Sequence, residues 1–247
     1  MKKHKVYIIG AGAGSKDYLT LKAFEILTSY PDVVIYDRLI SEDVINLIPP
    51  NVEKIFAGKE PKFHHMKQGE INNEIINQVN LGKKVIRLKG GDPFIFGRGG
   101  EEILELKNAN IEFEVIAGIS AANLSASRFN IPLTFREISD GVIYLSGHSY
   151  DDNPPKIDYA YLAKASVTIV LYMSVGNIKI IAENFMQAGM DKNKNVAAVQ
   201  SASLKEEKII YGNISNIAQK IIESNISNPA IIIIGDVVKI SENLNNI

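Results

Sequence analysis

Near its amino terminus the chain reads Val6-Tyr7-Ile8-Ile9-Gly10-Ala11-Gly12-Ala13-Gly14. A continuous apolar run followed by glycines is typical of a strand that is buried on both faces of a parallel sheet and then turns sharply. Apolar residues recur at helical spacing over 19–27, and Pro31 and Asp32 then end the predicted helix. Another apolar run, Val33–Tyr36, predicts the next strand. The chain therefore opens with a βαβ unit.

Strands and helices continue to alternate through the first half. The apolar runs and the helical spacing predict the strands 85–88 and 113–116 and the helices 71–80 and 100–107. This alternation indicates a parallel sheet.

The second half changes character, because a polar stretch that contains Pro154 and Pro155 separates its first two strands. The predicted strands are 142–145, 167–172, 196–199, 208–211 and 230–234, with a helix at 178–187. Near Pro132 the periodic pattern lapses, which indicates a boundary between the halves. The predicted fold class is α/β, with two α/β domains over residues 1–136 and 137–247.

Composition and charge exclude several classes of protein. Hydrophobic residues make up 46% and charged residues 22% of the 247, which argues against a disordered or fibrous chain. The 27 Lys and Arg nearly balance the 28 Asp and Glu, and a net charge of −1 argues against a dedicated nucleic-acid binder. Without cysteine there is no thiolate nucleophile and no iron–sulfur cluster. No stretch approaches the roughly 20 apolar residues of a membrane span, so we expect no membrane partner and a cytoplasmic protein.

The first glycine-rich loop, 10–14, follows a strand and precedes a helix, which is where a parallel sheet binds nucleotides. Asp32 lies about 20 positions on and Asp37 ends the second strand, as a dinucleotide site requires. The loop is not a regular G-x-G-x-x-G. These residues alone therefore leave open an NAD site, another nucleotide-like cofactor and a tight structural turn.

A second glycine-rich segment, 88–102, again joins a strand to a helix and is far less common. Gly90 and Gly91 followed by Asp92 and proline force a sharp turn, and the Asp92 carboxylate can accept hydrogen bonds from a ligand. Aromatic side chains lie close by in sequence, and Arg98 stands between glycines, which favours carboxylate recognition by its guanidinium group. We interpret this segment as functional.

The remaining candidates are weaker. Small residues over 118–123 follow a strand and can either pack a helix start or line a cofactor pocket. His64, His65 and His148 have no carboxylate at a ligand-like spacing, so we predict no metal site. The chain has no Gly-x-Ser-x-Gly motif, which leaves a hydrolase triad without support.

Taken together, these motifs resemble those of the uroporphyrinogen-III C-methyltransferases, within the tetrapyrrole methyltransferase superfamily. The segment 88–102 is the most specific of them. The other matching segments are 36–41, 58–59, 68–72, 118–122, 131–134, 146–148, 172–173 and 229–238. They follow the family's order and span nearly the whole chain.

The resemblance implies a cofactor cleft between the two domains, S-adenosylmethionine as methyl donor, a tetrapyrrole substrate and a homodimer. It places Asp37 as the proton acceptor and Lys59 as the proton donor. The positions that it assigns to the cofactor are Ala13, Gly90, Gly91, Asp92, Ile95, Ser120, Ala121, Met173 and Ala202. Those that it assigns to the substrate are Arg38, Arg98, Glu101 and Arg136.

Two readings of Asp37 compete: a dinucleotide-fold analogy places it on a ribose, whereas the family pattern places it beside the substrate. We follow the family pattern, because the Gly90–Asp92 segment supplies another acidic contact for the cofactor. The chain departs from the family at Ala13 and Ala202, which stand where proline and glycine are usual, and at Phe135, where histidine is common.

We therefore predict methylation of uroporphyrinogen III at two positions to give precorrin-2, which serves sirohaem and cobalamin biosynthesis. The alternative within the superfamily is a methyltransferase that acts on a later precorrin or cobalt-precorrin. An NAD-dependent oxidoreductase and a catalytically silent tetrapyrrole-binding module are rivals from other classes.

Overall fold

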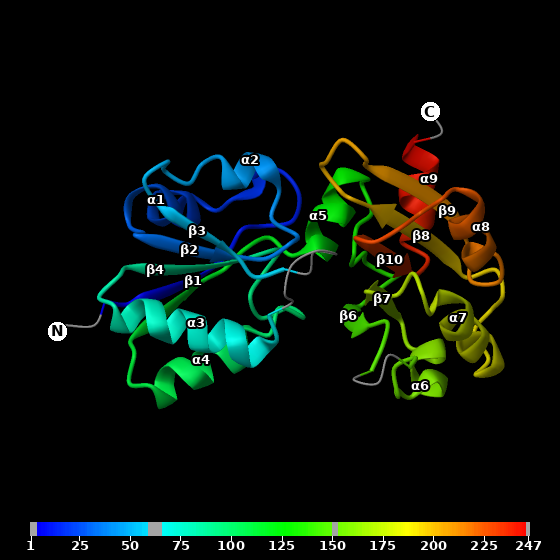
Figure 1. Ribbon diagram of the computed structural model, residues 1–247. Coiled ribbons are helices and arrows are strands. Elements are labelled where there is room, and N and C mark those ends of the chain that lie inside the picture. The colour runs from blue at the N-terminus through cyan, green and yellow to red at the C-terminus, as the bar shows by residue number, and fades with distance from the viewer. Residues whose placement is uncertain (1–3, 59–65, 150–152, 246–247) are drawn as a thin grey trace. The chain divides into compact units, whose positions relative to one another are not determined.

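The described residues form two units, each built around its own β-sheet (Figure 1). This computed structural model describes residues 4–58, 66–149 and 153–245. The units are Met1–Ala121 and Ala122–Ile247, so the division lies earlier than the one that the sequence predicts after Arg136. Helix α5 (Ala121–Arg128) explains the difference, because Arg128 donates to Glu207 at 3.0 and 2.8 Å and the backbone of Ala122 donates to Tyr172 at 3.1 Å.

The first unit contains a parallel sheet in the order β3-β2-β4-β1-β5. Its described strands are β1 (Val6–Gly10), β2 (Val33–Tyr36), β3 (Glu53–Phe56), β4 (Val85–Lys89) and β5 (Phe113–Ile116). The four strands predicted from the apolar runs are confirmed. Strand β3 was not predicted, and it lies at the sheet edge with two exposed charged residues, as edge strands often do.

Helices cover both faces of this sheet, as the βαβ pattern requires. The helices are α1 (Leu21–Ser29), α2 (Glu42–Ile45), α3 (Gln68–Asn80) and α4 (Gly99–Asn108), with a short 3₁₀ turn, η1 (Lys16–Tyr18). One core cluster joins α1 and α2 to Ile86 and Leu88 of β4. The other joins α3 and α4 to Val85, so alternate residues of β4 serve opposite faces.

This arrangement makes the carboxyl end of β4 a switch point. The connections that follow β1 and β2 pass over the face covered by α1 and α2, whereas the connection that follows β4 passes through α4 on the opposite face. Because β1 and β2 are the neighbours of β4, adjacent loops diverge there. Ligands of open parallel sheets bind in the crevice that such a divergence leaves.

The second unit contains a mixed sheet in the order β6-β7-β10-β8-β9. Its described strands are β6 (Gly141–Ser146), β7 (Val167–Tyr172), β8 (Asn195–Gln200), β9 (Lys208–Asn213) and β10 (Ala230–Ile234). Strands β6 and β7 are parallel, and β10 is antiparallel to both β7 and β8. A short loop joins β8 to β9, and such a connection suits antiparallel neighbours.

Helices also cover both faces of the second sheet. Helices α6 (Tyr159–Lys164), α7 (Ile178–Gln187) and α8 (Ile217–Glu223) form one core with β7, β8 and β10. On the other face, α9 (Val238–Asn245) places Ser241 at 2.7 Å from the hydroxyl of Tyr211, and Ser241 also donates to the carbonyl of Phe129. These contacts tie residues 122–129 to the second unit.

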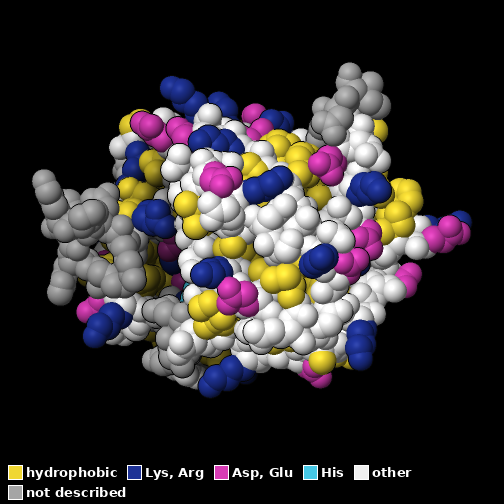
Figure 2. Space-filling model, turned by 90° about the vertical axis from the view of Figure 1, so that its right-hand side faces the viewer, with side chains coloured by type: hydrophobic (Ala, Val, Ile, Leu, Met, Phe, Trp, Pro, Cys, Tyr) yellow, Lys and Arg dark blue, Asp and Glu magenta, His cyan; other side chains and the backbone are white. Residues whose placement is uncertain are grey.

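The surface carries charges of both signs. On the face shown in Figure 2, lysines and arginines are interspersed with aspartates and glutamates, and hydrophobic side chains lie singly or in small groups between them. Within the described ranges, none of the helices is long and apolar enough to cross a bilayer.

Candidate active site

Three loops meet at the carboxyl edge of the first sheet. The backbone of Ala11 donates to Lys89 at 2.8 Å, and Gly12 and Gly91 exchange hydrogen bonds of 3.2 and 2.7 Å. The Asp92 carboxylate accepts from the backbone of Phe94 at 2.9 Å and from that of Gly118 at 3.1 Å. The loops after β1, β4 and β5 therefore form one structure, which we call the glycine loop cluster (residues 10–14, 90–92 and 118–121).

Glycine is required in this cluster for two different reasons. A Cβ on Gly118 would lie 2.2 Å from the carbonyl oxygen of Gly91, and one on Gly10 would lie 2.6 Å from the nitrogen of Gly118. These two glycines let the loops pack backbone to backbone. Gly91 differs, because it has φ +69° and a Cβ there would come within 4 Å of just one described atom, the nitrogen of Ala121 at 4.0 Å. The backbone at Gly91 is therefore open to a ligand.

The glycine loop cluster contains most of the positions that the sequence assigns to a cofactor in the first unit. They are Ala13, Gly90, Gly91, Asp92, Ser120 and Ala121, and Ile95 follows in the turn that Asp92 begins, where its backbone donates to the Asp92 carbonyl at 3.3 Å. Asp92 also links the loops, a role that sequence reasoning missed. Each carboxylate oxygen can accept a second hydrogen bond, so this link leaves room for a ligand.

Asp37 lies at the same sheet edge, directly after β2. Its Oδ1 accepts a hydrogen bond from Nη2 of Arg87, and its Oδ2 lies 3.8 Å from Nζ of Lys89. Both cations also contact Oε1 of Glu102, with Nε of Arg87 and Nζ of Lys89 each at 2.9 Å. We call these four side chains the Asp37 network.

Burial shapes the electrostatics of the Asp37 network. The side chain of Asp37 is 30% exposed, whereas those of Arg87, Lys89 and Glu102 are exposed by 3% or less. Burial opposes the charge of Arg87, but Asp37 and Glu102 outweigh it and raise the pKa of that guanidinium. Burial, and then repulsion by Arg87, lower the pKa of Lys89.

Arg98 and Glu101 pair with each other at the start of α4. The guanidinium of Arg98 donates to both carboxylate oxygens of Glu101, at 2.8 and 2.6 Å, and both side chains are about half exposed. The hydrogen bond from Arg98 lowers the pKa of Glu101. Phe94 and Phe96 expose aromatic surface in the preceding loop, and Arg38 is exposed beside Asp37. A substrate carboxylate that binds Arg98 must therefore displace Glu101 or bind beside it.

In the second unit, Met173 and Ala202 come to one edge of the sheet. Strands β7 and β8 are both antiparallel to β10, so their carboxyl ends lie at the same edge, where the backbone of Ser201 donates to Pro229 at 3.0 Å. Met173 has φ 53° and is 42% exposed. Ala202 stands between Ser201 and Ser203, which also have positive φ. This edge therefore presents its backbone in tight, left-handed turns.

Comparison with known proteins identifies the family. Residues 5–218 match the model of the Tetrapyrrole (Corrin/Porphyrin) Methylases. The chain belongs to this family. A solved Uroporphyrin III C-methyl transferase from Thermus thermophilus is similar to this tetrapyrrole methylase, with a TM-score of 0.81 and 36% identity over 96% of this chain and 99% of that one. A cobalt precorrin-4 methyltransferase shares the fold with a TM-score of 0.84, at 27% identity over 94% of this chain and 95% of that one.

The curated relatives are longer proteins. The siroheme synthase of Pseudoalteromonas atlantica is 42% identical over 98% of this chain, and that of Acinetobacter baylyi is 41% identical over the same share. In both cases the match covers 52% of the relative. The tetrapyrrole methylase chain thus spans about half the length of the curated relatives it matches.

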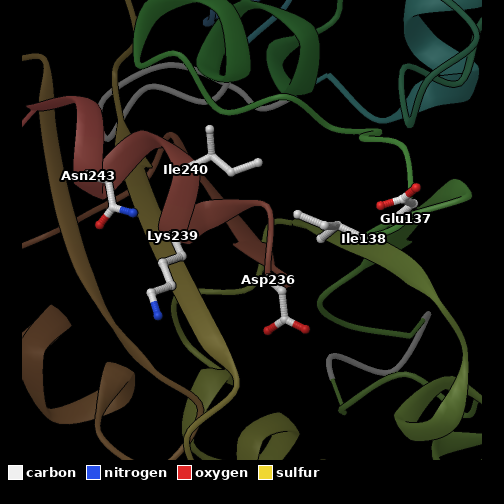
Figure 3. Close-up of a pocket in the computed structure, with 6 residues that line it drawn as sticks. All are labelled: Glu137, Ile138, Asp236, Lys239, Ile240 and Asn243. Carbon is white, nitrogen blue, oxygen red and sulfur yellow. The ribbon is translucent and has the colours of Figure 1, made fainter.

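Arg136 lies apart from the other predicted residues of the second unit. It precedes β6, in a tight turn in which the backbone of Phe135 donates a hydrogen bond to the carbonyl of Ser139. The backbone of Asp140 then donates to the carbonyl of Ser166, the residue before β7. This is the amino edge of β6 and β7, opposite to the edge that carries Met173. A cavity lies at this second edge, lined by Glu137, Ile138, Asp236, Lys239, Ile240 and Asn243 (Figure 3). It contains no residue that the sequence assigns to substrate or cofactor.

Of the other candidates from the sequence, Asp32 is described by the structure, and three more lie outside the described residues. Asp32 accepts from the backbone of Lys84 at 2.8 Å at the amino ends of β2 and β4, so it is remote from the glycine loop cluster. A ribose contact by Asp32, as in a dinucleotide site, is therefore ruled out by the sheet topology. Lys59, His64 and His65 lie outside the described residues. Among the residues that are described, no group of three His, Cys, Asp or Glu side chains is arranged to hold a metal ion.

Sequence reasoning missed Arg87, Lys89 and Glu102 as members of the site. A signal was present, since two cations occupy alternate positions of a strand whose pattern predicts burial on both faces. Buried cations in a parallel sheet require anionic partners. The identity of those partners depends on the packing of α4 and on the end of β2, which the local sequence does not reveal.

Proposed function

We propose that this tetrapyrrole methylase transfers methyl groups from S-adenosylmethionine to two positions on uroporphyrinogen III, giving precorrin-2. The observation that carries the proposal is the joint position of the glycine loop cluster and the Asp37 network at one sheet edge. The likeness to a solved Uroporphyrin III C-methyl transferase over nearly the whole chain supports it.

The residues present fit the methyl donor. Gly91 offers open backbone, and Asp92 keeps lone pairs for hydroxyl or amino groups. We assign Ala13, Gly90–Asp92, Ile95, Ser120 and Ala121 to the donor in the first unit, and Met173 and Ala202 in the second. When bound, S-adenosylmethionine supplies a methyl group on a sulfonium, and a solved relative from Thermus thermophilus is complexed with the demethylated product, S-adenosylhomocysteine.

The proposed chemistry needs a proton acceptor and cations. A carbon nucleophile that gains a methyl group develops positive charge, which is relieved when a proton leaves. We assign this proton to Asp37 and the role of proton donor to Lys59. The substrate carries many carboxylates, and we assign Arg38, Arg98 and Arg136 to them, with Glu101 contacting the substrate beside Arg98.

Binding of the donor can be tested directly by calorimetry with the whole chain. We expect S-adenosylhomocysteine to bind and NAD to give no heat above dilution. If NAD binds and S-adenosylhomocysteine does not, the site serves an oxidoreductase and the proposal is wrong.

Replacing Arg98 by alanine should raise the KM for uroporphyrinogen III by roughly tenfold or more, because a charge-assisted hydrogen bond contributes about 1.5–3 kcal/mol. We expect kcat to change little. Arg128→Ala is the matched control, since Arg128 makes the same two-pronged contact with Glu207 in the second unit. An equal KM for Arg98→Ala and the wild type would remove Arg98 from the substrate site.

A second candidate, methylation of a cobalt-precorrin, is favoured by the structural likeness to a cobalt precorrin-4 methyltransferase. The two candidates differ in the macrocycle that receives the methyl group. Incubation of the chain with labelled donor and each macrocycle separately distinguishes them, and we expect label on uroporphyrinogen III. Label on the cobalt-precorrin alone would favour the second candidate.

We also propose that the chain acts as a homodimer in the cytoplasm. Light scattering of the purified chain should give twice the mass of one chain. A monomeric mass with full activity would contradict the dimer.

A further inference from the structure

The Asp37 network places three buried charged side chains next to one partly exposed carboxylate, that of Asp37. Two cations and Glu102 lie within the first unit, and Gln68 adds a hydrogen bond of 3.2 Å to Oε1 of Glu102. Among the described residues, the other oxygen, Oε2, has no hydrogen-bond partner. Buried ion pairs contribute little net stability, because desolvation offsets their attraction. The arrangement therefore calls for an explanation other than stability.

The geometry of the Asp37 network has a direction. The buried Glu102 contacts Arg87 and Lys89 through one oxygen, Oε1. On their other side these two cations lie next to Asp37, whose side chain is the most exposed of the four in the network. Arg87 occupies Oδ1 of Asp37. Lys89 lies 3.8 Å from Oδ2, beyond hydrogen-bond distance but close enough for strong attraction. Oδ2 is therefore attracted by Lys89 but receives no hydrogen bond from it.

We propose that Glu102 and Lys89 are positioning residues that act on Asp37: together with Arg87 they orient its carboxylate and balance the field that sets its affinity for the substrate proton. This inference rests on the proposed function, since it takes Asp37 as the proton acceptor. It goes beyond that function in assigning two further residues, neither of which contacts the substrate.

The proposal predicts that Glu102→Gln and Lys89→Met change the ease of protonating Asp37 in opposite directions. The described charged groups that contact Asp37 are Arg87 and Lys89 from β4, and these two contact Glu102 of α4 in turn. The next residue along the chain, Arg38, is exposed to solvent, and Gln68 of α3 is uncharged. Glu102→Gln removes an anion, so the remaining cations oppose protonation of Asp37 more strongly. Lys89→Met removes a cation, so protonation becomes easier. A purely structural role would shift both variants in the same direction or shift neither.

The test is the pH profile of kcat for methyl transfer. We expect the acid limb to move to lower pH in Glu102→Gln and to higher pH in Lys89→Met, each by about one unit, the size of shift that a neighbouring charge produces. In the double variant Lys89→Met/Glu102→Gln the limb should return close to the wild-type position. Affinity for S-adenosylhomocysteine should remain within a few-fold of wild type in each variant.

Matched controls come from a second ion cluster on the same sheet. Glu114 of β5 pairs with Lys5 and Lys22 near the amino end of that strand, away from Asp37. Glu114→Gln and Lys22→Met make the same changes in net charge and should leave the profile unchanged.

The outcomes separate the inference from the proposed function. If the wild type transfers no methyl group, the proposed function fails. If the wild type is active but both single variants keep its acid limb, or shift it in the same direction, the inference is overturned and the function stands. Should a single variant fail to fold, the charge-balanced double variant decides, since a displaced limb in that protein contradicts the proposal.

Discussion

Replacing Asp37 by asparagine should lower kcat by about 10²–10⁴-fold, the usual contribution of a positioned general base. Asparagine has nearly the same size and can still accept the hydrogen bond from Arg87, but it cannot take a proton. We expect affinity for S-adenosylhomocysteine to stay close to that of the wild type, because the glycine loop cluster is untouched. Single-turnover methyl transfer and calorimetry measure the two quantities separately.

Asp32→Asn is the control for this variant. Asp32 lies at the other end of the same strand, β2, where it accepts from the backbone of Lys84. The charge change is identical and the distance from the substrate edge is large, so kcat should be unaffected. Equal turnover in Asp37→Asn and the wild type would remove the proton-acceptor role from Asp37.

Replacing Gly118 by alanine should abolish most donor binding. The new Cβ would lie 2.2 Å from the carbonyl oxygen of Gly91 and 2.8 Å from backbone atoms of Gly10, and backbone cannot give way as a flexible side chain does. Overpacking of this kind costs about 1–3 kcal/mol. If the loops move apart to relieve the clash, affinity for S-adenosylhomocysteine should fall by about tenfold or more, equivalent to about 1.4 kcal/mol.

Gly100→Ala is the matched control, because a Cβ at Gly100, in the first turn of α4, would meet no atom of the described residues within 4 Å. We expect unchanged donor binding and a small gain in stability, about 0.4–1 kcal/mol, since alanine restricts the unfolded chain. Calorimetry and urea denaturation report the two effects. Undiminished binding in Gly118→Ala would show that the close packing of the loops does not shape the donor site.

The sequence predicts the elements whose local pattern is strong. Buried strands such as β2, β7 and β10 have the predicted bounds, because continuous apolar runs leave little choice of state. Strand β3 was missed, since Glu53 and Lys54 on an edge strand interrupt any apolar pattern. Helix α5 was foreseen only as a possible start of a helix after 118, and its packing against the second unit depends on long-range contacts of Arg128 and Phe129.

The candidate site shows the same limit. From its residues alone the sequence indicates a function for the segment 88–102, but it leaves a structural role open for the loops 10–14 and 118–123. The assignment of Asp37 came from the family resemblance. The partners of Asp37 could not be predicted, because Arg87 is 50 residues away from it in sequence. Glu102 reaches Arg87 only because α4 packs against the sheet next to β4. The position of Arg136 could not be predicted either: the family pattern assigns it to the substrate, and it lies at the other edge of the second sheet from Met173.

We expect this chain to move methyl groups from a sulfonium donor to a polyanionic ring, and the mass of the ring after reaction decides whether it does. The whole chain would be incubated anaerobically with uroporphyrinogen III and S-adenosylmethionine that carries an isotopically labelled methyl group. We predict a product with two labelled methyl groups and equivalent formation of S-adenosylhomocysteine. A ring recovered at its original mass, with the donor unconsumed, would show that the chain does not methylate uroporphyrinogen III.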